Sequence, residues 1–165
     1  MPIEVREITS GEALRYKQFF MAGLIQDEEA FRISPGDEIN APFPTSDKAD
    51  SFTLGAYENK ILLGVASFQR DGQNREKLRH KGLIIRMYVA PQSRRKGIGN
   101  LLLLELVKRI RQIKDIEIVW LTVVSNNRAA KSLYEKHGFK IFSLELKAIK
   151  WKGKYFNESS MALEL

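Results

Sequence analysis

The stretch of the chain most able to do chemistry runs from Val89 to Leu102. It places three cations before two glycines, in the order Arg94, Arg95, Lys96, Gly97, Ile98, Gly99, Asn100. Glycines at the start of a helix let a ligand approach the backbone, and the free N–H groups and dipole of the first turn attract anions. The adjacent cations add to the attraction for phosphate. The sequence therefore predicts a pyrophosphate-binding turn at residues 94–100.

The turn must be positioned by a strand before it and a helix after it. Residues 83–89 are typical of a buried strand, which ends at Ala90-Pro91 because proline cannot donate to a ladder. A helix from Gly97 to about Ile113 is predicted by apolar residues on one face. Ile116–Val124 reads as the next buried strand, so we expect a right-handed crossover. The strands ending at Val89 and Val124 should be parallel neighbours.

A second informative segment runs from Asn126 to Phe139, with the sequence NNRAAKSLYEKHGF. Asparagine is a favourable helix N-cap, and the glycine before Phe139 is a usual helix stop. Three residues of the intervening helix, Ala130, Leu133 and Tyr134, share one face. The segment therefore predicts a short helix that follows the second strand and presents Tyr134.

The basic turn fits neither a Walker loop nor a dinucleotide-binding fingerprint. Arg94-x-x-Gly97-x-Gly99, with the asparagine-containing segment about 30 residues later, instead resembles the Gcn5-related N-acetyltransferase (GNAT) superfamily. The resemblance is strong over residues 82–139 and extends elsewhere to the order of elements. It implies an α/β (α+β) fold in which residues 1–165 form one domain. The expected sheet is mixed, mainly antiparallel and six- to seven-stranded, with helices on both faces.

The resemblance also implies a site for acetyl-CoA as co-substrate, without a metal. The backbone of residues 87–89 would pair with the pantetheine arm, and the Val89 N–H would point at the thioester oxygen. Tyr134 would lie near the sulfur, where a phenol can protonate a leaving thiolate. Tyr134 as a packed core aromatic remains the alternative. The expected cofactor-binding residues are Met87, Tyr88, Val89, Arg94, Arg95, Lys96, Gly97, Ile98, Gly99, Asn100 and Asn127.

The general base is left open by the sequence. Some branches of the family carry a glutamate at the position that matches Thr122, and threonine cannot accept a proton at neutral pH. Glu28, Glu29, Glu145, Glu158 or a chain of waters are the remaining candidates.

The function implied is acetyl-CoA-dependent N-acetylation of a primary amine. Because the chain has no cysteine, no acyl-thiol intermediate can form on it, and direct attack in a ternary complex is expected. A non-catalytic acyl-CoA-binding module of the same fold is the alternative. The net charge of +7 also permits nucleic-acid binding. The cations are scattered, however, so no nucleic-acid partner is expected.

Composition sets the remaining limits. A chain of 165 residues with 44% hydrophobic content can bury one sizeable core. No stretch reaches the roughly 18–20 apolar residues of a membrane span, so we expect no membrane partner and a cytoplasmic protein. A homodimer is left open.

The other expected elements flank these segments. A strand at Ile3–Ile8 precedes a helix that a Thr9–Glu12 capping box begins. Further expectations are a short helix from Asp27 to Phe31, a loop at Ser34–Asp50, a hairpin of Ser51–Glu58 and Ile61–Arg70, a basic loop at Asp71–Lys81 with a solvated His80, and strands at Lys140–Ile149 and Lys154–Leu165.

Overall fold

One mixed sheet organises the molecule. The computed structural model describes residues 2–165, except for the side chains of Gln73 and Asn74. Over this range the sheet has seven strands in the order β1-β2-β3-β4-β5-β7-β6. Only β4 and β5 are parallel neighbours. The strands are β1 Glu4–Ile8, β2 Ser51–Glu58, β3 Ile61–Arg70, β4 Lys81–Val89, β5 Ile118–Val124, β6 Lys140–Trp151 and β7 Lys154–Glu164.

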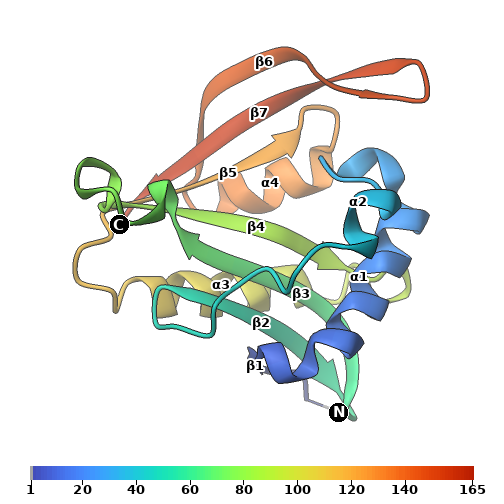
Figure 1. Cartoon of the computed structure of the whole chain (residues 1–165), viewed down its shortest axis with the longest axis horizontal. Coiled ribbons are helices and arrows are strands. Elements are labelled where there is room, and N and C mark those ends of the chain that lie inside the picture. The colour runs from blue at the N-terminus through green and yellow to red at the C-terminus, as the bar shows by residue number, and fades with distance from the viewer. Residues whose placement is uncertain (1) are drawn as a thin grey trace.

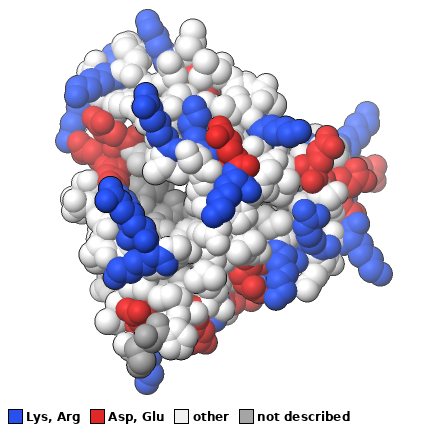
Figure 2. All heavy atoms as spheres, turned by 180° about the vertical axis from the view of Figure 1, so that it is seen from behind, with Lys and Arg blue, Asp and Glu red and all other residues white. Residues whose placement is uncertain are grey.

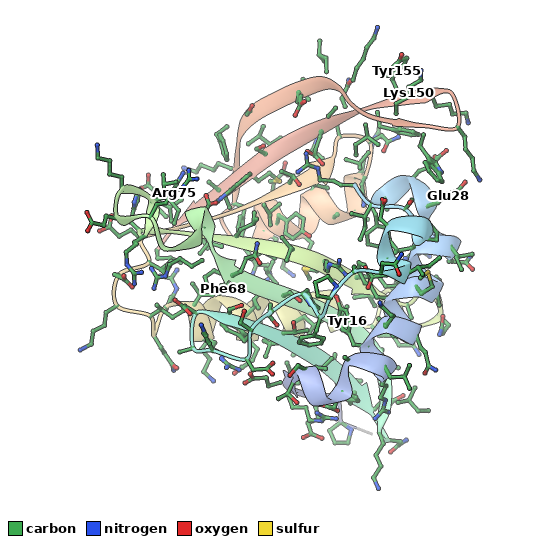
Figure 3. The ribbon with its side chains drawn as sticks, viewed as in Figure 1. Tyr16, Glu28, Phe68, Arg75, Lys150 and Tyr155 are labelled. Atoms are coloured by element: carbon green, nitrogen blue, oxygen red, sulfur yellow. The ribbon has the colours of Figure 1, made fainter. Side chains whose placement is uncertain are left out.

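Helices cover both faces of the sheet, as expected (Figure 1). The α-helices are α1 Ala13–Gln26, α2 Pro35–Ile39, α3 Ile98–Ile110 and α4 Arg128–Lys136, and short 3-10 turns lie at Ser10–Glu12, Glu28–Ala30, Asp71–Asn74, Glu76–Leu78 and Pro91–Ser93. On one face α1 buries Tyr16, Phe20 and Leu24. Tyr16 is labelled in Figure 3. On the other face α3 buries a row of leucine and isoleucine side chains against β2, β3 and β4. No helix in the described part of the chain has the length and apolar character needed to cross a membrane.

Besides shifts of one or two residues at strand ends, three helical segments differ from the sequence expectation. The predicted loop at 34–50 contains α2, because Ser34 accepts from the Asp37 N–H at 3.2 Å and Pro35 occupies the first turn. The helix after Gly97 ends at Ile110, since the next residues form tighter bonds such as Ile113 N–H to Ile110 C=O at 2.9 Å. The segment from 27 to 31 forms only a single 3-10 turn.

A bulge in β4 changes which face its residues present. Tyr88 pairs with Val65 and Ile85 pairs with Ser67, so two residues of β4 oppose one residue of β3. The extra residue shifts the strand's alternation by one position. Ile84 therefore packs on the α3 face while Tyr88 packs on the α1 face.

The parallel strands β4 and β5 pair only at their beginnings. Their register covers Lys81–Leu83 against Ile118–Trp120, and beyond this the two strands diverge (Figure 1). The expected parallel neighbours are therefore confirmed, although they are adjacent at one end alone. The divergence opens a wedge in the sheet between the carboxyl ends of the two strands.

Candidate functional site

The wedge between β4 and β5 contains a cavity of about 1160 Å³. The cavity is lined by the turn at 93–100, by β4, β5 and α4, and by residues 26–33 together with Glu158. We call the part beside residues 94–100 the turn end and the part beside Glu158 the acceptor end. Seen from behind, the molecule has a hollow with basic side chains along its rim and acidic side chains near one end (Figure 2). Cationic and acidic side chains thus lie beside one another around the cavity, as in the pairs Arg94–Asp27 and Arg32–Glu158.

Backbone N–H groups gather at the turn end. Gly97 caps α3 with a φ of 76°, a left-handed conformation that favours glycine. The first bond of the helix runs from the Leu101 N–H to the Gly97 C=O at 3.0 Å. The amides at 98–100 therefore precede the helical bonding pattern and are oriented as donors for an anion.

Arg94 is the cation at this end with the best-defined geometry. Its guanidinium donates to the Asp27 carboxylate at 2.7 Å and to the Val89 carbonyl at 3.0 Å. The Tyr88 hydroxyl donates to the same Asp27 oxygen at 2.9 Å. Sequence reasoning missed Asp27, which reads there only as an acidic helix start. Arg95 also lines the cavity, whereas Lys96 is not among its lining residues.

Glycine at position 99 lets α3 approach α4 and β4. A Cβ atom there would lie 3.1 Å from the Leu133 Cδ2 and 3.8 Å from the Met87 Cε. The side chain of the next residue, Asn100, forms a 2.7 Å hydrogen bond with His137 Nε2. Burial lowers the pKa of His137, so the neutral ring donates and the Asn100 oxygen accepts. The sequence carried no signal for this pair.

The free edge of β4 faces the wedge. The Ala90 N–H donates to the Leu63 carbonyl of β3, so the backbone groups of Val89 point toward the opposite edge. Met87 and Val89 also pack toward the α3 face, while the side chain of Tyr88 is turned away. The wedge thus presents backbone groups of β4 to an extended ligand.

Asn127 and Tyr134 both line the cavity from the α4 side. Asn127 caps α4, accepting from the Ala130 N–H at 3.2 Å. Tyr134 is 7% exposed, and its ring centroid lies 5.9 Å from that of Phe139. Burial raises the pKa of Tyr134 to about 12, so its phenol stays protonated at neutral pH. The residue packs in the core and reaches the cavity as well.

The four glutamates considered as bases have different surroundings. Glu158 lines the cavity and is 4% exposed, with its carboxylate 3.3 Å from Arg32 Nε. Glu28 also lines it but is bound by Lys152, with 2.9 Å contacts to both oxygens. Glu29 lines it with half of its side chain exposed. Glu145 is exposed and is not a lining residue.

A family model, the acetyltransferase (GNAT) family, matches residues 16–139 of this chain. A curated relative, the N-alpha-acetyltransferase of Sulfurisphaera tokodaii, is 40% identical over 60 residues. That match covers 36% of this chain and 36% of the relative. The chain therefore aligns with only about a third of that relative's length.

Solved structures with the same fold cover nearly the whole chain. A GNAT acetyltransferase of Streptococcus pneumoniae superposes with a TM-score of 0.87 and 22% identity, over 99% of this chain and 100% of that one. A putative acetyltransferase of Salmonella typhimurium, solved with its cofactor acetyl-CoA, gives a TM-score of 0.81 and 18% identity. This superposition covers 100% of this chain and 95% of the Salmonella protein. At these sequence identities the similarity shows a shared fold.

Proposed function

The chain belongs to the GNAT acetyltransferase family, and we propose that it transfers the acetyl group of acetyl-CoA directly to a primary amine. The observation that carries the proposal is the continuity of one cavity. It joins the donor-rich turn at 94–100, the free edge of β4 and the buried phenol of Tyr134. A phosphate-bearing carrier with a long polar arm and a reactive end fits that order of groups.

The turn end suits the pyrophosphate of acetyl-CoA. The amides of Ile98, Gly99 and Asn100 would donate to phosphate oxygens, with Arg94 and Arg95 supplying charge. Lys96 would contribute through its charge at longer range, because it does not line the cavity.

The middle of the cavity suits the arm and its thioester, an acyl group already activated for transfer. Backbone groups of Met87, Tyr88 and Val89 would hold the arm as an added strand, and the side chain of Asn127 would hydrogen-bond it. The Val89 N–H, directed into the wedge, would donate to the carbonyl oxygen as negative charge develops there.

Tyr134 is the proposed proton donor to the departing sulfur. Its phenol keeps its proton because burial raises its pKa to about 12. A retained proton is what a donor to a developing thiolate needs. The chain has no cysteine to carry the acetyl group, so the amine attacks the thioester itself.

The test combines binding with turnover. Calorimetry with acetyl-CoA measures binding, and release of free thiol in the presence of a panel of amines and N-terminal peptides measures transfer. We expect binding without amine and thiol release only with an acceptor. Binding without thiol release for any acceptor would contradict catalysis, and no binding would contradict the whole proposal.

A further inference from the structure

Glu158 is the most deeply buried carboxylate at the acceptor end, with 4% of its side chain exposed. It lies on β7 opposite Val124 of β5, and Ser160, two residues further along β7, lies opposite Thr122. Residues two apart on a strand share a face, so Glu158 is diagonal to Thr122 on the same face of the sheet. Strand β7 thus places a carboxylate beside Thr122, the position of β5 at which some members of the family carry a glutamate.

We propose that Glu158 is the general base that takes the proton from the acceptor's ammonium group. The inference rests on the proposed function. The Glu158 carboxylate accepts one proton from R–NH3+ and leaves R–NH2, whose lone pair forms the new C–N bond. The C–S bond breaks, Tyr134 protonates the sulfur, and the proton lost from nitrogen restores the phenol. Glu158 then releases its proton to solvent.

The acceptor end is already built to hold a cation on Glu158. Arg32, at the end of the segment that follows α1, lies 3.3 Å from the carboxylate and is itself 61% exposed. Arg32 is a weak competitor, since its exposed guanidinium is solvated again when it leaves the carboxylate. An ammonium group entering the cavity can therefore replace Arg32 at the buried carboxylate without leaving that charge unpaired.

Flanking ion pairs join the same segment to the β6–β7 hairpin. Lys152, in the turn of the β6–β7 hairpin, binds Glu28 at 2.9 Å, and Lys154 lies 3.9 Å from Glu29. Figure 3 shows Glu28 near the end of α1, on the side of the molecule where the hairpin projects. Glu28 and Glu29 are 34% and 52% exposed and face these lysines, whereas Glu158 is the buried one of the three glutamates that line the cavity.

The surroundings of Glu158 favour proton uptake. Burial raises its pKa, and Glu145, directly opposite on β6, raises it further. Arg32 and the Thr122 hydroxyl act in the other direction. A carboxyl with a raised pKa is better matched to a general base working near neutral pH.

The experiment compares the unmodified protein with Glu158→Gln and with a matched control, Glu164→Gln, an exposed glutamate near the end of the same strand. Acetyl-CoA binding should be the same in all three. Thiol release should be measured with an amine that the unmodified protein acetylates. Its rate should fall at least 10²-fold in Glu158→Gln and stay unchanged in Glu164→Gln, because the loss of a general base lowers the rate on that scale. The residual rate of Glu158→Gln should rise tenfold per pH unit up to the pKa of the amine, because without a base only the fraction of amine that is already deprotonated in solution reacts.

A second readout uses the protein without any ligand. A carboxyl group whose pKa is higher in the folded protein than in the unfolded chain stabilises the fold while it is protonated. This stability is fully present below the pKa of the unfolded chain and is lost as pH rises through the pKa of the folded protein. The free energy of unfolding of the unmodified protein, relative to Glu158→Gln, should therefore fall with pH above about 4.5.

Each result decides between the proposals. Equal turnover in Glu158→Gln, or equal pH dependence of stability, would overturn the role of Glu158 while leaving the proposed function standing. Absence of acetyl-CoA binding or turnover in the unmodified protein would overturn the proposed function, and the base with it.

Discussion

Arg94 is joined to Asp27 across 2.7 Å, which ties the basic turn before α3 to the end of α1. The pair means that one of the two arginines that line the proposed pyrophosphate site already has a carboxylate partner. An incoming phosphate must share the guanidinium with Asp27, and it would meet an uncompensated negative charge if Arg94 were absent.

This pair makes the role of Arg94 testable by a double-mutant cycle. Arg94→Met should raise the Kd for acetyl-CoA by about tenfold or more, because a charge-assisted phosphate contact is lost and Asp27 is left unpaired. Asp27→Asn alone completes the cycle, and Asp27→Asn combined with Arg94→Met should recover only part of that loss. Calorimetry at low and physiological salt measures both. Full recovery in the double variant would mean that Arg94 serves only to neutralise Asp27.

Tyr134→Phe separates the two roles of the buried phenol. The variant keeps the ring that packs beside Phe139 and removes the proton. We expect kcat to fall about 10²-fold or more, because a positioned general acid usually contributes on that scale. The affinity for acetyl-CoA should be unchanged. Steady-state kinetics and thermal unfolding measure the effects. A variant that turns over normally but melts earlier would identify Tyr134 as a packing residue alone.

Arg86 and Glu38 form a buried pair at the β4 bulge. Arg86 has a φ of 54° and donates to Glu38 at 2.7 Å, with Glu38 only 1% exposed. Glu38→Ala leaves the guanidinium unpaired, so we expect a loss of about 3–5 kcal/mol in the free energy of unfolding. Glu105→Ala, which breaks the exposed pair with Lys108, should cost about 0–1 kcal/mol. Urea unfolding compares them, and similar losses would show that the bulge does not depend on the buried pair.

Alkaline pH should destabilise the fold through its buried phenols. Burial raises the pKa of both Tyr16 and Tyr134 to about 12. Their folded values lie above the unfolded value of about 10, so the stability they confer is intact below pH 10 and is lost between pH 10 and 12. Each phenol should contribute a slope of up to about 1.4 kcal/mol per pH unit in that window.

Urea unfolding between pH 9 and 11 measures this slope. Tyr134→Phe should flatten it, and Tyr155→Phe, which removes a hydroxyl from a side chain that is 53% exposed, should not. An identical slope in Tyr134→Phe would mean that its phenol ionises as easily in the folded protein as in the unfolded chain.

The sequence by itself determined the elements that depend on near neighbours along the chain. The strand before Pro91, the glycine cap of α3 and the Asn127 cap of α4 follow from backbone restrictions that act within a few residues. The adjacency of β4 and β5 followed as well, because a crossover of that length leaves few other arrangements. The helix α2 was missed because its five residues carry too short a periodic pattern.

Only the tertiary structure decided how the side chains of the site meet. The bulge at Arg86 reverses which side chains of β4 face each side of the sheet. No local sequence pattern predicts it, because it is set by pairing with β3. The contact of Asp27 with Arg94 and the place of Glu158 beside Thr122 join residues from distant parts of the chain. Such contacts depend on the register of strands and the packing of helices, since these bring together charges that the sequence keeps apart.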